Sequence, residues 1–255
     1  MRLYLDVGNT RAKWLLIRAD QSSLDGLVNT EDFTALASQV DESAKNETLD
    51  GVFVSSVAGA ATNDRIGAWV CNSYDLTPVF AEVEKCAFGV TVAYENIRNL
   101  GVDRWLALVA GRAGAPESQI IVDAGSALTV DYLSANGQHL GGFIVPGVNM
   151  MIGALFDRTD AVKVSAELSG ADLLPGRDTA GCVRNGTLVI LKGFLEKVWQ
   201  IGRQINCDER FVLTGGDAGS LISLCEGFNV VVDPNLVFTG LKVYSDEYRL
   251  TNAQY

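Results

Sequence analysis

The chain has 255 residues, of which 48% are hydrophobic and 20% charged, so we expect a substantial core in one large domain or two medium ones. Its 31 acidic and 20 basic residues give a net charge of −11, which argues against a general DNA or RNA binder, because phosphate neutralisation dominates such affinity. No apolar run reaches the roughly 18 residues that a membrane helix needs, so we expect no membrane span.

The cysteines and the single histidine bear on the remaining classes of chemistry. The five cysteines are widely spaced and form no C-x-x-C pair, which disfavours a zinc site or a disulfide framework and fits a reducing cytoplasm. The N-terminal run carries Asp6, which disfavours a secretory signal peptide. His139 follows an expected turn at residues 134–137, so we predict a solvated hairpin residue and not the base of a hydrolase.

The first half of the chain predicts alternating strands and helices. We expect two strands joined by a tight turn over residues 2–19, a helix over 31–45, a strand over 51–57, a helix over 62–74, a short strand over 77–81 and an apolar helix over 102–113. Glycine and proline residues at 111–117 interrupt regular secondary structure and predict a domain boundary there. We expect an N-terminal domain over 1–114 and a C-terminal domain over 115–255.

The second half restarts the same pattern. We expect two strands around a glycine turn from residue 119, a hairpin into 141–146, one long helix over 178–206, a strand over 211–214, a helix over 218–225, a strand over 228–232 and a last helix from 234. The long helix carries a second apolar face at Leu188, Leu191 and Leu195. This face favours burial against a partner subunit in a homodimer over the alternative, a central helix buried wholly inside one subunit. The alternation of strands and helices predicts an α/β fold.

One short pattern occurs twice. Asp6-Val7-Gly8-Asn9-Thr10 and Asp123-Ala124-Gly125-Ser126-Ala127 each close an apolar run and precede another strand-like run. Each predicts an acid at a strand end, a tight glycine turn and a returning strand. Glycine lets backbone N–H groups face an anion, and the acid can hold a cation directly or through water. The repeat therefore predicts that two turns bind the phosphates and metal of a nucleotide from two sides. The sequence contains neither a P-loop motif nor a Rossmann G-x-G-x-x-G motif after a strand.

Several charged side chains near these patterns have both a structural and a functional interpretation. Lys13 either reaches a phosphate or is a solvated strand residue. Asp6 and Asp123 either stabilise turns or serve the nucleotide, and their duplicated context favours function. Asp103 begins the apolar helix, where it either caps the helix or takes a proton from a hydroxyl, and the adjoining Arg104 could hold an anionic substrate group.

Six segments in order resemble type III pantothenate kinase. They are 6–10 with Lys13, Tyr94 with 100–105, 123–131, 141–147, 178–179 with Gly186, and 214–218. The resemblance covers about residues 3–242. It implies an α/β fold of two ribonuclease-H-like domains, of the actin-like ATPase type, with a cleft between them.

The resemblance implies ATP-dependent phosphorylation of pantothenate to 4'-phosphopantothenate, the first step of coenzyme A biosynthesis, with Mg²⁺ and in a homodimer. It makes Asp103 the catalytic proton acceptor and Asp123 a ligand of a monovalent cation, K⁺ or NH₄⁺. It places ATP on Asp6, Val7, Gly8, Asn9, Thr10, Arg11, Ala12, Lys13 and Ser126. It places pantothenate on Tyr94, Gly101, Val102, Asp103, Arg104 and Thr179.

Two positions depart from the family pattern. Ser126 stands where threonine is usual and keeps the hydroxyl. Ile97 stands where proline is common, between Tyr94 and Gly101, which predicts a looser loop. Two other functions compete with the kinase: a non-catalytic, nucleotide-binding accessory factor for transcription, and an ATPase that acts as a conformational switch. Asp103, Asp123 and the Gly8 turn argue against the first, and the chain length leaves no room for the extra domain of the second.

Overall fold

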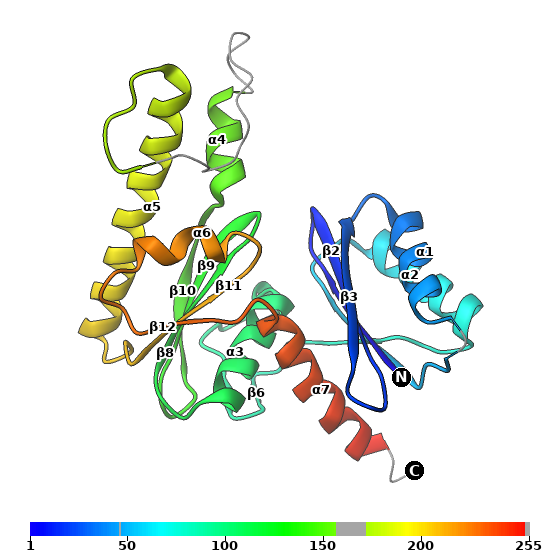
Figure 1. Ribbon diagram of the computed structural model, residues 1–255. Helices are drawn as coiled ribbons and strands as arrows, with labels where there is room; N and C mark the ends of the chain where they lie inside the picture. The colour runs from blue at the N-terminus through cyan, green and yellow to red at the C-terminus, as the bar shows by residue number, and fades with distance from the viewer. Residues whose placement is uncertain (46, 157–171, 253–255) are drawn as a thin grey trace. The chain divides into compact units, whose positions relative to one another are not determined.

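A computed structural model describes residues 1–45, 47–156 and 172–252 (Figure 1). The chain divides into two compact units, which we describe separately. The first unit comprises Met1–Gly114 together with the C-terminal segment from Leu236, and the second comprises Ala115–Asn235. Across the described residues no helix is long and apolar enough to cross a membrane.

The first unit is built on a five-stranded sheet of order β3-β2-β1-β4-β5. Its central strand β1 pairs antiparallel with β2 and parallel with β4. The strands are β1 (Arg2–Val7), β2 (Arg11–Ile17), β3 (Ser23–Asn29), β4 (Gly51–Ser56) and β5 (Val79–Phe80), with a separate ribbon of β6 (Cys86–Ala87) and β7 (Val90–Thr91). The helices are α1 (Phe33–Ser43), α2 (Ala60–Tyr74), η1 (Ile97–Asn99), α3 (Val102–Gly114) and α7 (Leu236–Asn252).

Alternate residues of β1 face two different layers, as the period of a strand requires. Leu3 and Leu5 lie in a buried cluster with side chains of α1 and α2. Tyr4 points the other way, and its hydroxyl lies 3.1 Å from the Ser245 hydroxyl on α7. Strands β1 and β4 are buried on both faces, which explains why they are almost continuously apolar.

The last helix belongs to the first unit and not to the second, so the expected grouping of 115–255 differs from the packing. α7 packs along α3 and against β1 and β4. Gly240 permits the close approach, because a Cβ there would lie 2.0 Å from the carbonyl oxygen of Leu106. A larger residue at 240 would push the two helices apart.

The second unit repeats the topology of the first. Its sheet order is β10-β9-β8-β11-β12, and its central strand β8 pairs antiparallel with β9 and parallel with β11. The elements are β8 (Gln119–Ala124), β9 (Ala127–Leu133), β10 (His139–Pro146), α4 (Val148–Phe156), α5 (Thr179–Gln204), β11 (Arg210–Thr214), α6 (Ala218–Leu221), η2 (Ile222–Leu224) and β12 (Val230–Val232). The matching orders confirm the duplication that the sequence repeat predicts.

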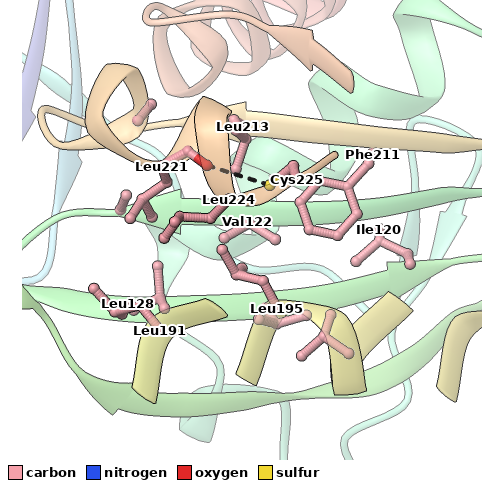
Figure 2. Close-up of a cluster of buried hydrophobic side chains, with 14 of the residues drawn as sticks. Ile120, Val122, Leu128, Leu191, Leu195, Phe211, Leu213, Leu221, Leu224 and Cys225 are labelled. Atoms are coloured by element: carbon pink, nitrogen blue, oxygen red, sulfur yellow. Dashed lines mark hydrogen bonds between the residues drawn. The ribbon is translucent and has the colours of Figure 1, made fainter. Parts of the chain in front are cut away.

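The second apolar face of α5 is a core face, so the predicted interface on it is wrong. Leu191 is 1% exposed and Leu195 is fully buried, and both lie in one cluster with side chains of β8, β9 and β11 (Figure 2). The neighbouring position Ile190 is 60% exposed instead. Helical periodicity gives the two faces of the helix, but only the sheet decides which face it covers.

The prediction of a solvated His139 is also wrong. Its side chain is buried, and its Nε2 lies 2.9 Å from Oδ1 of Asp131, which is buried as well. The expected turn before it is present, because the Ser134 amide donates to the Gln138 carbonyl. Five elements do not follow from the sequence pattern: strand β3 at a sheet edge, the short strands β6 and β7, the short helix η1 and helix α4.

Thiol chemistry should separate the cysteines into two groups. Burial raises the pKa of the Cys207 thiol to about 11, and burial does the same for Cys225, whereas Cys71, Cys86 and Cys182 are exposed. Because the thiolate is the nucleophile, we expect three fast equivalents with an aromatic disulfide reagent at about pH 8 in the native protein. The remaining two should appear only in denaturant, and five fast equivalents would contradict this assignment.

Candidate functional site

The first repeated pattern forms a tight turn between β1 and β2. The Gly8 amide donates to the Arg11 carbonyl at 2.9 Å, and Asn9 and Thr10 are exposed at the tip. Thr30 fixes the turn from the side, because its hydroxyl donates to the Gly8 carbonyl at 2.8 Å and its amide to the Thr10 carbonyl at 3.1 Å. The turn is thus held by its backbone, and its tip is left accessible to a ligand.

Asp6 lies just before this turn with polar partners on both neighbouring strands. The Ser55 hydroxyl on β4 donates to Oδ1 of Asp6 at 3.1 Å. On the other side Lys13 is the residue of β2 paired with Asp6, so the two side chains share a face of the sheet. The arrangement brings a carboxylate and an ammonium group to one strand end, where a nucleotide phosphate and its metal need opposite charges.

A pocket of about 320 Å³ adjoins the first turn. It is lined by Asn9, Thr30, Glu31, Ala58, Gly59, Thr62 and Arg65. Gly59 is the N-cap of α2 and Thr62 lies in its first turn, and both line the pocket, so the positive end of this helix is at the pocket. No sequence motif marks Gly59 or Arg65, so neither residue was among those expected at the site.

The second repeated pattern forms the equivalent turn in the second unit. The Gly125 amide donates to the Ala127 carbonyl at 3.1 Å, and Ser126 is exposed at the tip. Asp123 lies before the turn and pairs with Thr129 on β9 and Thr214 on β11. A hydroxyl residue therefore stands beside the acid on the parallel neighbour in both units, Ser55 in one and Thr214 in the other.

Two glycines let other strands approach the second turn at backbone distance. A Cβ on Gly147 would lie 2.3 Å from the Gly125 carbonyl oxygen, and the Gly147 amide donates to the Ser126 carbonyl at 3.0 Å. Gly215 has φ +91°, and a Cβ there would lie 2.3 Å from Oδ1 of Asp123. Side chains at either glycine would displace the turn.

Both turns lie where ligands are expected in sheets of this kind. In each unit the central strand runs parallel to one neighbour, so that the carboxyl ends of the two strands lie side by side: β1 with β4, and β8 with β11. The neighbour on the other side of the central strand, β2 or β9, runs antiparallel. Ligands of open α/β sheets bind beyond the carboxyl ends of the strands, at the point where the connections diverge. The duplicated motif thus occupies a binding edge in each unit.

The start of α3 brings four of the expected substrate residues together. The backbone amide of Arg104 donates to Oδ1 of Asp103 at 2.8 Å, so the carboxylate satisfies one of the unpaired amides of the first helical turn. A Cβ on Gly101 would lie 2.4 Å from the same oxygen, so a side chain at this position would turn the Asp103 carboxylate away from its present direction. Buried Arg104 donates from Nη1 to the Tyr94 hydroxyl at 3.1 Å, with its guanidinium 5.9 Å from the ring centre.

The segment that carries Tyr94 is fixed from both sides. Lys85 donates from Nζ to the carbonyls of Val92 and Tyr94 at 2.7 and 2.9 Å, a role that no sequence signal indicated. Ile97, expected to loosen this segment, begins the short helix η1, which the Asn96 side chain caps. The Tyr94 ring therefore has a defined place beside Arg104.

The remaining expected site residue, Thr179, belongs to the second unit. It is the first residue of α5 and is exposed, and the neighbouring Asp178 caps the helix by accepting from the Gly181 amide at 2.7 Å. Among the described residues no group of three or more metal-ligating side chains occurs, so Asp123 does not belong to a protein-only metal cluster there.

Comparison with known proteins decides the family. A family model for type III pantothenate kinase matches residues 2–201. The chain belongs to the type III pantothenate kinase family. A relative from Saccharophagus degradans is 36% identical, covering 96% of this chain and 99% of its own, and one from Teredinibacter turnerae is 35% identical over the same shares. Both are named type III pantothenate kinases.

Solved structures support the fold class. The chain is similar to a structure described as a Baf family transcriptional activator from Campylobacter jejuni, with 21% identity, a TM-score of 0.60 and coverage of 96% and 98%. It is similar to a dehydratase activator from Clostridium difficile (13%, 0.59, 100% and 97%) and to MreB 5 from Spiroplasma citri (9%, 0.52, 99% and 98%). These likenesses confirm the α/β, actin-like ATPase fold, and at such identities they show the fold alone.

Proposed function

We propose that this member of the family phosphorylates pantothenate with ATP, the first step of coenzyme A biosynthesis, in the cytoplasm. The observation that carries the proposal is the start of α3, where Asp103, Gly101, Arg104 and Tyr94 lie together. The family match and the near full-length relatives support the substrate. The transcriptional accessory factor, which would need none of this substrate geometry, is not favoured.

The two turns bind ATP in this proposal. Backbone amides around Gly8 and Lys13 contact the phosphates from the first unit, and the Ser126 hydroxyl does so from the second. Asp6 fits a role near Mg²⁺, because Mg²⁺ in kinases is held through one or two carboxylates together with the substrate phosphates. When bound, Mg²⁺ offsets phosphate charge, while the protein supplies orientation.

Asp103 acts as the proton acceptor. Its carboxylate is fixed by the Arg104 amide, so it has a defined direction before substrate arrives. As the primary hydroxyl of pantothenate attacks the γ-phosphorus of ATP, its proton passes to Asp103, and the bond to the ADP oxygen breaks. Arg104 and Tyr94 hold the acidic and amide parts of pantothenate in line for this attack.

Asp103→Asn tests the proposal. The amide keeps an oxygen for the Arg104 N–H but cannot take the proton, so pantothenate-dependent ADP release should fall by about 10²- to 10⁴-fold while ATP still binds. Asp32→Asn is a matched control, because Asp32 caps α1 by accepting from the Ala35 amide and lies outside the expected site. Turnover of Asp103→Asn within about threefold of wild type would reject this residue as the base.

Asp123 is proposed to bind a monovalent cation, K⁺ or NH₄⁺. The residue paired with Asp6 is Lys13, whereas the residue paired with Asp123 is Thr129, which has no charge. A cation from solution would supply on the second unit the charge that lysine supplies on the first.

Exchange of K⁺ for a bulky organic cation at constant ionic strength should therefore abolish most activity. Asp123→Ala should remove the dependence on K⁺ that wild type shows. Asp208→Asn should retain it, because Asp208 precedes β11 at the opposite end of the strand from Thr214, the residue paired with Asp123. Equal wild-type rates in the two salts would show that no such cation is required.

A homodimer through α4 and α5 is also proposed, on side chains other than those first expected. The two helices pack together within the second unit (Figure 1). Their exposed apolar residues are Met150, Leu155, Val189 and Ile190. Exposed apolar side chains on two neighbouring helices are typical of a protein interface, and the same two helices of a second copy are the simplest complement.

Ile190→Glu should convert dimers to monomers in sedimentation experiments, because a carboxylate in the interface would lose its water. Gln200→Glu adds the same charge at another exposed position of α5 and should leave the dimer intact. Leu191→Glu is unsuitable, since it places a charge in the core. A wild-type chain that sediments as a monomer at micromolar concentration would refute the interface.

A further inference from the structure

The hairpin of β9 and β10 contains a bulge. His139 pairs with Leu133, but the next pair is Gly142 with Asp131, so β10 has one residue more than β9 over this stretch. Gly141 has φ +97°, a conformation that glycine adopts readily and that commonly forms such bulges. Every pair after the bulge is therefore shifted by one residue from the register before it.

This shift has consequences at both faces of the sheet. It pairs Phe143 with Val130, so Phe143 lies on the same face of the sheet as buried Val130. Its ring is 6.2 Å from the Tyr132 ring and 6.4 Å from the Phe194 ring, although the residue remains 40% exposed. Without the extra residue, the same ring would point to the opposite face, because side chains alternate along a strand.

The shift also reaches the second phosphate turn. At its end, β10 pairs Pro146 with Ala127, and the Gly147 amide then donates to the Ser126 carbonyl at 3.0 Å. Without the bulge, Pro146 would take the place of Gly147. Proline has no N–H to donate, so this hydrogen bond to the turn would be lost.

The buried pair of His139 and Asp131 bridges the bulge. His139 is the last paired residue of β10 before it, and Asp131 is the β9 partner of the first pair after it. Both residues are 3% exposed, and Nε2 of His139 lies 2.9 Å from Oδ1 of Asp131. The carboxylate passes over Gly142, where a Cβ would lie 2.9 Å from the same Oδ1.

We propose that His139 is a positioning residue for the second phosphate turn. Through Asp131 it fixes the bulged register of β10, and that register places the Gly147 amide on the Ser126 carbonyl. The inference rests on the proposed function, since it assigns Ser126 to ATP. It assigns no chemistry to the imidazole, which acts through backbone geometry alone.

His139→Phe tests the proposal, because it fills the site but donates no hydrogen bond to Asp131. We expect the Kd for a non-hydrolysable ATP analogue and the KM for ATP to rise at least about tenfold, since small misplacements of a binding group are costly. The KM for pantothenate should stay within about threefold. His139→Gln keeps an N–H donor and should restore nucleotide affinity to within about threefold of wild type.

Tyr132→Phe is the matched control. It removes a buried hydrogen bond on the adjacent residue of β9, from the Tyr132 hydroxyl to the Val198 carbonyl at 2.9 Å, but on the other face of the strand. It should lower the thermal midpoint and leave nucleotide affinity unchanged. If His139→Phe fails to fold, Asp131→Ala decides instead, because it removes the acceptor of the same hydrogen bond. It should raise the KM for ATP at least about tenfold and leave the KM for pantothenate within about threefold of wild type.

Two outcomes would overturn the positioning role. One is nucleotide affinity within about threefold of wild type in a folded His139→Phe, and the other is an equal rise in the KM values of both substrates. Binding of the ATP analogue is measured without phosphoryl transfer. A wild-type chain that binds it but leaves pantothenate unphosphorylated would refute the proposed function and leave the register test intact.

Discussion

Close approach of backbone to backbone at the carboxyl ends of β1 and β8 is the constraint on which the rest of the structure depends. In the first turn a Cβ on Gly8 would lie 3.1 Å from the Arg11 carbonyl oxygen. In the second unit two further segments come within backbone distance of the turn through Gly147 and Gly215. A binding site for phosphate needs exposed N–H groups in fixed directions, and side chains at these points would separate the strands that fix them. The polar residues of the site are therefore secondary to this packing.

Local chemistry explains how much of the fold could be predicted from the sequence. Both turns, the strands around them and the apolar helix α3 follow from short runs whose partners are adjacent in the chain. Strand β3 was missed because most of its side chains are exposed at a sheet edge, so its pattern lacks a clear apolar alternation. Helix α4 was missed because nine mostly apolar residues show no helical period.

The errors in the site and the core come from partners distant in sequence. The environment of His139 is decided by a bulge and by Asp131 on the next strand, which composition around a polar turn cannot reveal. The core face of α5 is decided by the sheet beneath Leu191 and Leu195. The unit to which α7 belongs is decided by its fit against α3 at Gly240, after the chain has completed the second sheet.

The two units show how a duplicated backbone can acquire unequal chemistry. The topology, the penultimate acid of the central strand and a hydroxyl on its parallel neighbour are the same in both. The residues across the hairpin differ, with Lys13 in one and Thr129 in the other. Only the first unit has Asp103 fixed at a helix start beside Arg104 and Tyr94. Phosphate binding by backbone N–H groups depends on the fold of the turn, so both copies of a duplicated unit retain it. A proton acceptor is a single side chain, and one is enough for each transferred phosphoryl group.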